Sequence, residues 1–599
     1  MIYHCEDHTC NYWDEGEKLP ERCPQCGRKL LRANEADMTG DDWTALGNTL
    51  WDAEASDKKR MVDCFRKAAY LGSAWGVCNL GICMEQGNGV EADPVQAFWL
   101  YQQAVEMGSL NAVCCLGVCY EYGIGTAPDA EKAAELYCKA AEYGSPRGQM
   151  LLAHAFHDGI GVEADAAEAV NWVRAAAYQR YGEGMHRLGV CYEYGDGVEQ
   201  NWERAVHWFR EAAESGVSAA MTDLGYCYEK GCGVEQSWEQ AFSWYRRGAE
   251  CGYPVSMSNL GLCYKRGYGV DQNWQEAIKW YEQGAQCGDL QSMHNLACCY
   301  ERGEGVEQNE ERALYWYRRS AEGGNGDAMC NLGRCYERGY GVDQNWQEAV
   351  KWYEQGAQCG HLQSMNNLAC CYEDGEGVEQ NMTEAIRWYT AAAEGGNADA
   401  MHDLGWLYDH GEGVEQDMKK AICWYERAAE QNHPAAMNSL GECYAMGRGV
   451  PRDLETATEW YRRAAELGEA MADYNMGWHL EQAGKLSEAY AHYRKAADGN
   501  DDSAWWALGR FYENGVVVAQ DGKEARRCYE TGEKLGNVKC KMRLARCKLL
   551  GIGGRRAKKA GLDLCRQALE LAKESSEKED YGYEAEMNLL RRTIAENES

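Results

Sequence analysis

The sequence predicts an all-α fold, a solenoid of about fifteen stacked two-helix repeats of 36 residues, preceded by a small N-terminal module. A leucine followed by Gly or Ala recurs every 36 residues from Leu80 to Leu440, and Met476 continues the register. Copies with slipped spacing occur at Leu46, Leu508 and Leu544. Because self-similarity at a fixed period indicates a repeat architecture, we predict repeats over residues 41 to about 579. We call the recurring leucine the anchor.

The first helix of a repeat is seen in residues 219–231, AAMTDLGYCYEKG. Met221, Leu224 and Tyr228 fall at i, i+3 and i+7, which places them on one apolar stripe. Gly231 ends the helix, because glycine adopts the left-handed conformation at a helix end at little cost.

The second helix begins after a capping residue. The caps are Asn201, Ser237, Asn273, Asn309, Asn345, Asn381, Asp417 and Asp453. Apolar residues then recur at four-residue spacing, as in Ala241, Tyr245 and Ala249. A helix pair cannot bury its apolar face alone, so we expect neighbouring pairs to stack.

Charge restricts the class of partner. The 599 residues include 61 Lys and Arg against 95 Asp and Glu, a formal charge of −34. Such a chain repels nucleic acid and anionic membranes, which favours a protein or peptide partner, including a basic one. The N-terminal residues MIYHCEDHTC lack a secretory signal pattern, and no stretch approaches the roughly 20 apolar residues of a membrane span. We therefore predict a cytoplasmic protein without a membrane span.

Ten of the 30 cysteines follow the repeat. They stand three residues after the anchor, at Cys83, Cys119, Cys191, Cys227, Cys263, Cys299, Cys335, Cys371, Cys443 and Cys547. No second cysteine recurs at a matching place in every repeat, so we interpret these as buried thiols rather than as a disulfide framework.

Four cysteines precede the repeats in a metal-binding pattern. Cys5, Cys10, Cys23 and Cys26 form C-x4-C-x12-C-x2-C, and four thiolates match the tetrahedral preference of zinc. The pattern resembles a zinc-ribbon or rubredoxin-type knuckle. We predict a structural zinc module at residues 1–31 and a linker at 32–40; iron in the same thiolates and no metal remain alternatives.

The pattern LGxCYExGxGV followed by AxxWYxxAAExG, at a 36-residue period, resembles the Sel1-like repeat, a relative of the tetratricopeptide repeat. This resemblance covers residues 41 to about 579. It implies a right-handed superhelix whose concave side, lined mainly by first helices, binds other proteins. Members of the family act as scaffolds in protein quality control, signalling and bacterial host interaction. We assign residues 41–550 to the solenoid and 551–599 to a last partial repeat and C-terminal helical cap.

Two nearly identical segments differ partly at positions that are expected to face the concave groove implied by the resemblance. Residues 266–309 and 338–381 differ at four places: Ile278 and Val350, Asp289 and His361, His294 and Asn366, Arg302 and Asp374. The last two differences fall two before and six after the anchor, on the expected groove side. A diversifying binding surface and plain drift at exposed sites both explain them.

An acidic residue five positions after the anchor gives this groove a negative charge. It is Glu85, Glu121, Glu193, Glu229, Glu301, Glu337, Glu373, Asp409, Glu481 or Glu513. The expected neighbouring contacts are Tyr122, Tyr194, His186, His294 and His402. Such a groove would attract a basic peptide. Alternatively, the glutamate belongs to the framework and pairs with an adjacent cation, as Glu229 could with Lys230.

Three classes of function follow. The leading prediction is a non-enzymatic interaction scaffold, and the second is a secreted or host-directed effector that uses the same solenoid. An enzyme is disfavoured, because the sequence shows no Ser-His-Asp arrangement, no HExxH and no irregular repeat in which histidines and carboxylates gather.

Overall fold

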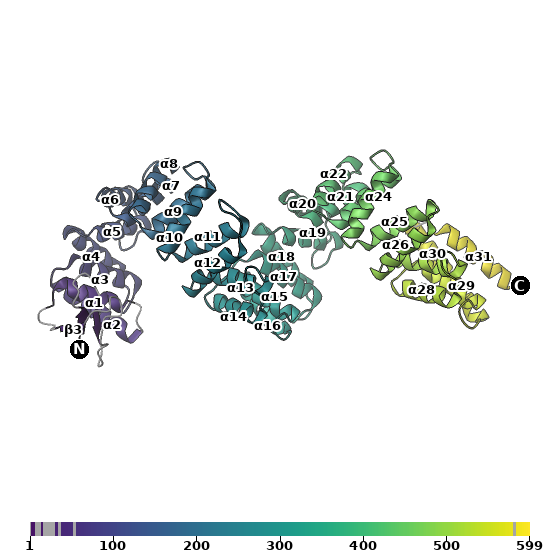
Figure 1. The fold of residues 1–599 in the computed structure, drawn as a ribbon, viewed down its shortest axis with the longest axis horizontal. Helices are drawn as coiled ribbons and strands as arrows, with labels where there is room; N and C mark the ends of the chain where they lie inside the picture. Colours follow the sequence, from purple (N-terminus) through teal and green to yellow (C-terminus); the bar gives the residue numbers. More distant parts are fainter. Residues whose placement is uncertain are drawn as a thin grey trace. The chain divides into compact units, whose positions relative to one another are not determined.

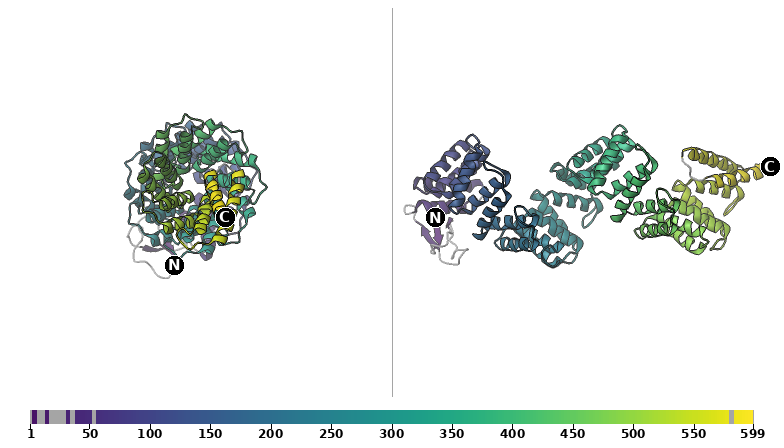
Figure 2. Two further views of the ribbon diagram at one scale, coloured as in Figure 1. Left: turned by 90° about the vertical axis from the view of Figure 1, so that its right-hand side faces the viewer. Right: turned by 90° about the horizontal axis from the view of Figure 1, so that it is seen from above.

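The computed structural model describes residues 2–5, 13–15, 30–33, 38–51, 55–578 and 583–598. The chain divides into two compact units, Met1–Asn309 (unit 1) and Glu310–Ser599 (unit 2). In each unit the helices follow one another as stacked pairs (Figures 1 and 2).

Unit 1 begins with a small antiparallel sheet that the sequence analysis did not predict. Its strands are β1 (Ile2–Cys5), β2 (Trp13–Glu15) and β3 (Leu30–Ala33), in the order β2-β1-β3. Fifteen helices follow: α1 (Gly40–Thr49), α2 (Ala55–Tyr70), α3 (Ala74–Gln86), α4 (Pro94–Glu106), α5 (Leu110–Tyr122), α6 (Ala130–Glu142), α7 (Pro146–Asp158), α8 (Ala166–Tyr178), α9 (Gly182–Tyr194), α10 (Trp202–Glu214), α11 (Ser218–Lys230), α12 (Trp238–Glu250), α13 (Pro254–Arg266), α14 (Trp274–Gln286) and α15 (Leu290–Arg302).

Unit 2 is helical throughout its described residues. Its helices are α16 (Glu310–Glu322), α17 (Gly326–Arg338), α18 (Trp346–Gln358), α19 (Leu362–Asp374), α20 (Met382–Gly395), α21 (Ala398–His410), α22 (Met418–Glu430), α23 (Pro434–Met446), α24 (Leu454–Glu466), α25 (Ala470–Gln482), α26 (Leu486–Asp498), α27 (Asp502–Asn514), α28 (Gly522–Lys534), α29 (Val538–Leu550), α30 (Lys558–Lys578) and α31 (Glu584–Glu598).

The helical repeat predicted from the sequence is confirmed. Odd-numbered helices from α1 to α29 are the first helices of the repeats, and the even-numbered helix after each is its second helix. Within a unit, each first helix packs on its second helix, which packs on the next first helix. Successive first helices also contact each other, as α5 does with α7 and α27 with α29, whereas successive second helices of the described chain stay further apart. First helices therefore line the narrower side of each stack.

The two glycines of the loop between the helices have different structural roles. Gly231 ends α11 with φ +73°, and the following Gly233 has φ +70°. A Cβ on Gly233 would lie 2.4 Å from the carbonyl oxygen of Trp202 in α10, so this loop packs directly on the backbone of the preceding repeat. Gly231 ends the first helix, and the close contact at Gly233 sets the distance between this loop and the preceding repeat.

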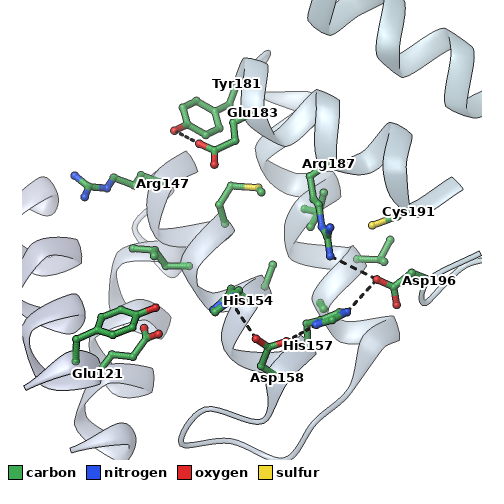
Figure 3. A pocket seen from close by; sticks show the side chains of 17 residues that line it. Glu121, Arg147, His154, His157, Asp158, Tyr181, Glu183, Arg187, Cys191 and Asp196 are labelled. Carbon is green, nitrogen blue, oxygen red and sulfur yellow. Dashed lines mark hydrogen bonds and ion pairs between the residues drawn. The ribbon is translucent and has the colours of Figure 1, made fainter. Parts of the chain in front are cut away.

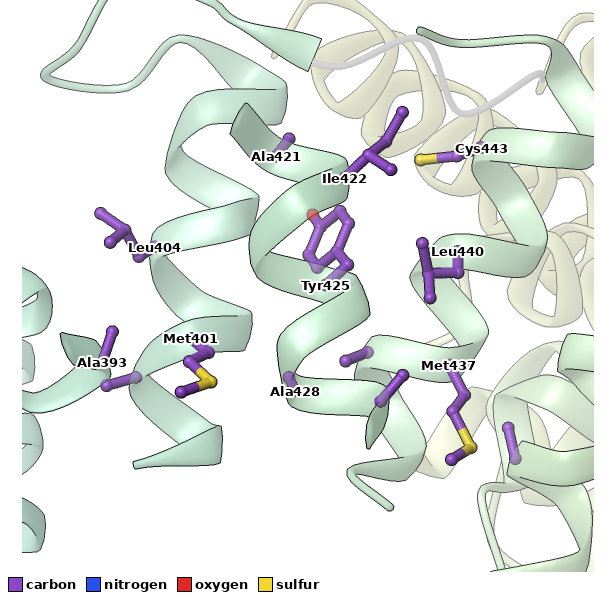
Figure 4. Close-up of a cluster of buried hydrophobic side chains, with 14 of the residues drawn as sticks. Ala393, Met401, Leu404, Ala421, Ile422, Tyr425, Ala428, Met437, Leu440 and Cys443 are labelled. Atoms are coloured by element: carbon purple, nitrogen blue, oxygen red, sulfur yellow. The ribbon is translucent and has the colours of Figure 1, made fainter. Parts of the chain in front are cut away.

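A buried aromatic ring fills the centre of nearly every helix pair. Tyr425 of α22 lies between Leu404 of α21 and Leu440 of α23, and all three are at most 1% exposed (Figure 4). The ring stands on the glycine after the anchor: a Cβ on Gly405 would meet the Tyr425 ring at 2.7 Å. The small residue after each anchor leaves room for this ring.

The cysteines three residues after the anchor are buried, as the thiol interpretation predicts. Burial raises the pKa of the Cys227 and Cys263 thiols to about 12. These side chains therefore stay protonated at neutral pH and pack as small apolar groups. No described helix is long and apolar enough to cross a membrane.

Thiol labelling tests this packing. With a thiol reagent at pH 7.5, we expect Cys251, Cys287, Cys359 and Cys423, which are exposed, to react at rates typical of free cysteine. Cys227 and Cys263 should stay unmodified until the protein unfolds, as peptide mass spectrometry would show. Rapid labelling of the buried set in the folded protein would contradict the packing described here.

Candidate functional site

The predicted groove glutamates make a recurring contact inside the repeat. Each lies near the end of a first helix, and at least seven of them accept a hydrogen bond from the hydroxyl of the buried tyrosine of the same pair. The bonds join Tyr101 and Glu85 (2.6 Å), Tyr137 and Glu121 (2.5 Å), Tyr245 and Glu229 (2.9 Å), Tyr353 and Glu337 (2.5 Å), Tyr389 and Glu373 (2.6 Å), Tyr493 and Glu481 (2.8 Å), and Tyr529 and Glu513 (2.8 Å). We call this bond the tyrosine–glutamate clasp. It gives the framework interpretation a definite contact, while peptide binding by these residues stays a prediction.

Two other pairs vary the clasp. Glu193 faces a pair filled by Phe209, which has no hydroxyl, and burial raises the pKa of this carboxyl. Asp409, only 3% exposed, accepts a hydrogen bond from Arg448 Nη1 at 2.9 Å. Glu301 lies half-buried at the equivalent place in α15.

Two buried tyrosines have no carboxylate at this place: Tyr461, where the residue is Ala445, and Tyr281. In the α13–α14 pair, Lys265 stands where the glutamate would be, and the buried hydroxyl of Tyr281 has no hydrogen-bond partner. The sequence difference at this one position therefore leaves a polar atom unsatisfied in the core, which costs free energy.

The predicted groove histidines lie half-buried between first helices. His186 Nε2 is 2.6 Å from Asp223 Oδ2 of the next first helix. His402 Nδ1 lies 3.1 Å from Asp403 Oδ1, and its ring stacks on His433 with 5.2 Å between centroids. His294 lies 3.4 Å from Gln291 Nε2 and 3.6 Å from Cys298 Sγ. These histidines thus have intramolecular partners in the folded chain.

Two of the four differences between the duplicated segments fall at exposed or capping positions. Arg302 and Asp374 are exposed at the ends of α15 and α19. Asp289 and His361 both cap a helix: the Asp289 carboxylate accepts from the Ser292 amide at 2.6 Å, and His361 Nδ1 accepts from the Ser364 amide at 3.2 Å. Ile278 and Val350 are both buried, as expected of a core exchange.

Of the four predicted zinc ligands, Cys5 is the last residue of β1. Cys10, Cys23 and Cys26 lie outside the described residues.

The α7–α8 pair departs from the usual repeat pattern at three positions. Val173 replaces the tyrosine, His157 replaces the glutamate, and Ala155 replaces the cysteine. A cavity of about 660 Å³ opens here among α5, α7, α8 and α9 (Figure 3). Its apolar lining is Met150, Leu151, Ala153, Ala169, Val170, Val173 and Cys191. Ala169 is 5% exposed, while its counterparts Ala133 and Ala205 are fully buried, so solvent reaches the core of this pair.

Charged groups form the rim of this cavity, which we call the α7 pocket. Asp158 pairs with both histidines of α7: it contacts His157 Nδ1, and its Oδ2 lies 3.1 Å from His154 Nε2. His157 Nε2 then reaches Asp196 Oδ2 at 3.2 Å, and Arg187 lies 3.6 Å from the same oxygen. Figure 3 shows this chain of contacts along one edge of the pocket. The imidazole contacts hold the pKa of Asp158 below its usual range.

The opposite rim is less tightly paired. Tyr181 donates to Glu183 at 3.1 Å, and Arg147 Nη1 lies 3.7 Å from Cys115 Sγ. In all, the rim holds four carboxylates, Glu121, Asp158, Glu183 and Asp196, against two arginines. The pocket is therefore apolar at its base and acidic at its mouth.

The chemistry of the α7 pocket suits binding. Cys191, the one thiol in its lining, is 2% exposed, and burial raises its pKa to about 11. No group of His, Cys, Asp and Glu among the described residues has the arrangement of a metal site. A pocket with an apolar base and a few polar groups at its rim is typical of ligand sites.

The sequence expectation that no repeat gathers histidines and carboxylates is wrong at α7. The signal was present in HAFHDG, residues 154–159, where the repeat pattern changes. This motif lines a pocket only because Val173 stands opposite it, and Val173 is fourteen or more residues away on another helix. Asp196, which lies after α9, could be placed beside His157 only by the stacking of the two repeats.

Exposed tyrosines flank the α7 pocket on first helices. Tyr122 is 66% exposed, Tyr194 73% and Tyr226 43%. They stand two or six positions after an anchor, the same positions as His154 and Asp158. We call this surface of α5 to α11 the first-helix face of unit 1.

The duplicated segments provide a matched test of the clasp. Tyr353→Phe removes a hydrogen bond to Glu337 and should destabilise the α17–α18 pair by about 1 to 2 kcal/mol. Tyr281→Phe removes a hydroxyl without a partner and should change stability by less than about 0.5 kcal/mol, or increase it. Local hydrogen exchange is the measurement, since repeat arrays do not unfold in one step. Equal effects of the two substitutions would rule out the clasp as a stabilising contact.

Comparison with known proteins places the repeat in a family. The Sel1 repeat model matches thirteen segments: residues 76–109, 112–145, 146–181, 182–217, 218–253, 254–289, 290–325, 326–361, 362–397, 398–433, 434–469, 470–501 and 504–537. No curated protein matches the chain.

Two solved structures are similar to this chain. The protein c5321, a protective antigen of uropathogenic Escherichia coli strains that displays an SLR fold, is 32% identical over 75% of this chain and 97% of its own, with a TM-score of 0.49. A Sel1 repeat protein from Oxalobacter formigenes is 33% identical over 41% of this chain and 96% of its own, with a TM-score of 0.37. The thirteen matched segments span most of the chain, and the chain belongs to the Sel1 repeat family.

Proposed function

We propose that this protein is a non-enzymatic interaction scaffold that binds a basic segment of a partner protein on the first-helix face of unit 1. The observation that carries the proposal is the row of exposed tyrosines, Tyr122, Tyr194 and Tyr226, beside an open pocket. Tyrosines supply large contact area with little rotamer entropy to lose, and they are enriched among residues that dominate binding energy. Solenoids of the Sel1 repeat family typically act as interaction scaffolds.

Charge supports a basic partner. The whole chain carries a formal charge of −34, and the rim of the α7 pocket has twice as many carboxylates as arginines. The clasp does not neutralise its glutamates, because a tyrosine hydroxyl donates a hydrogen bond without adding charge. The field at the first-helix face therefore attracts cationic segments and disfavours acidic peptides and nucleic acid.

Selection from a random peptide library displayed on phage tests this function. We expect the full chain to enrich peptides rich in Lys and Arg. A variant with Tyr122, Tyr194 and Tyr226 changed to Ala should bind the selected peptides at least about tenfold more weakly, because it loses the central aromatic contacts.

The chain offers a matched control. Tyr70, Tyr143 and Tyr178 are 92%, 68% and 69% exposed, but they lie at the ends of second helices. Changing these three to Ala should leave the measured peptide affinities within about twofold. Enrichment of acidic peptides, or equal losses in both triple variants, would contradict binding at the first-helix face.

We also propose that Cys5, Cys10, Cys23 and Cys26 hold a structural zinc ion. The support is the C-x4-C-x12-C-x2-C spacing, a ligand set that leaves no open position for catalysis. Elemental analysis of the purified chain should find about one zinc per molecule, lost on Cys23→Ser with Cys26→Ser. The control Cys251→Ser, which changes an exposed cysteine of a repeat, should retain the metal. Iron in place of zinc, or zinc retained by the double variant, would refute the assignment.

A further inference from the structure

We propose that the α7 pocket is the receptor for an aromatic side chain of the bound partner, preferably a tyrosine followed or preceded by a basic residue. The inference rests on the proposed function and names the residue type that the first-helix face recognises. It follows from what the α7–α8 pair lacks compared with the other pairs.

An aromatic ring stands at the same place in thirteen of the fifteen described second helices. They are Phe65, Tyr101, Tyr137, Phe209, Tyr245, Tyr281, Tyr317, Tyr353, Tyr389, Tyr425, Tyr461, Tyr493 and Tyr529, each at most 2% exposed. The ring is held against the residue after the anchor, where a Cβ on Gly189 would lie 2.5 Å from the Phe209 ring. Close packing of this kind makes the ring a structural requirement of the pair.

The α7–α8 pair carries Val173 at this place, next to Ala153 after the anchor. Valine is smaller than tyrosine by most of a ring. The helices of this pair leave part of that volume open. Val173, Ala153 and Ala169 all line the α7 pocket and remain 3% to 5% exposed. Part of the pocket is thus the space that a tyrosine ring fills in the neighbouring repeats.

The other pair without a ring shows how the missing apolar volume can be filled. In α29–α30 the equivalent residue is Cys565, and Met587 and Leu590 of α31 pack into the same core. A third helix, outside the pair, therefore supplies the missing apolar volume. In the α7–α8 pair none of the described helices does so, and the space opens toward the first-helix face.

The rim of the pocket defines the rest of the ligand. Carboxylates of Asp158 and Glu121 lie in the lining, where a phenol hydroxyl could donate to them as tyrosines donate to the clasp glutamates. Tyr122 stands at the mouth, 66% exposed, and can contact a neighbouring basic side chain through its ring. The excess of carboxylates over arginines favours that neighbour being Lys or Arg.

The probe for this inference is p-cresol, the side-chain analogue of tyrosine, added to the full chain and followed by ligand-observed NMR titration. Saturable binding of one p-cresol per chain is expected. Val173→Tyr restores the ring of the other repeats and should weaken that binding at least about tenfold. Ala153→Leu fills the pocket from the opposite helix and should do the same. If circular dichroism shows that Val173→Tyr has lost helix, Ala153→Leu takes its place as the test of the pocket.

The control is Val95→Tyr, the same substitution at a valine of α4 that is 56% exposed, which should leave p-cresol binding unchanged. Absent p-cresol binding, or equal binding to the wild type and both filled variants, would overturn the inference. If p-cresol fails to bind but selected basic peptides still depend on Tyr122, Tyr194 and Tyr226, the inference falls and the proposed function stands. If p-cresol binds at the pocket and no peptide is selected, the scaffold function falls and the protein partner with it.

Discussion

The buried aromatic ring at the centre of nearly every helix pair is the contact on which the rest of this solenoid depends. Its ring spaces the two helices, requires a small residue after the anchor leucine, and contacts the next first helix, as Tyr425 does Leu440. Full burial of such a side chain contributes about 1.5 to 3 kcal/mol. When its hydroxyl also donates to a half-buried glutamate, as Tyr353 does to Glu337, the polar tip is satisfied without water. One residue therefore fixes both the packing and the electrostatics of a repeat.

A few helix pairs differ from this common packing, and each difference has its own structural consequence. Lys265 leaves Tyr281 unsatisfied, Cys565 packs in one core with residues of α31, and Val173 lines an open pocket. The first departure changes a hydrogen bond, the second forms a cap, and the third opens a pocket with an acidic rim. A repeat protein can thus keep its framework while a few substitutions at the framework's central position create a binding site.

Much of the fold could be predicted from the sequence because it depends on local patterns. The 36-residue period, the Gly231-type helix ends and the Asn273-type caps each involve neighbours along the chain, and the structure confirms the helix pairs. The role of the glutamates could not be predicted this way. Glu229 and Tyr245 are sixteen residues apart on different helices, and only their packing shows that the carboxylate turns inward to a hydroxyl.

The site was missed for the same reason. His157 lies on α7, Val173 on α8 and Asp196 in the loop after α9. A search for catalytic motifs does not find this site, because the site depends on the absence of a ring at Val173. The small sheet at the N-terminus was also missed, since strands of three or four residues carry too short a pattern to recognise.

Peptide-resolved hydrogen exchange of the full chain, followed in unit 1 without any ligand, is the most direct measurement of the central claim. If the buried ring and its clasp hold each pair together, amides of α7 and α8 should exchange faster than those of α5–α6 and α11–α12, which keep Tyr137 and Tyr245. The α9–α10 pair, with Phe209 but no hydroxyl, should lie between them. Protection of α7 and α8 equal to or greater than that of the clasped pairs would contradict the account, because the pair without a ring would then be as stable as the pairs that have one.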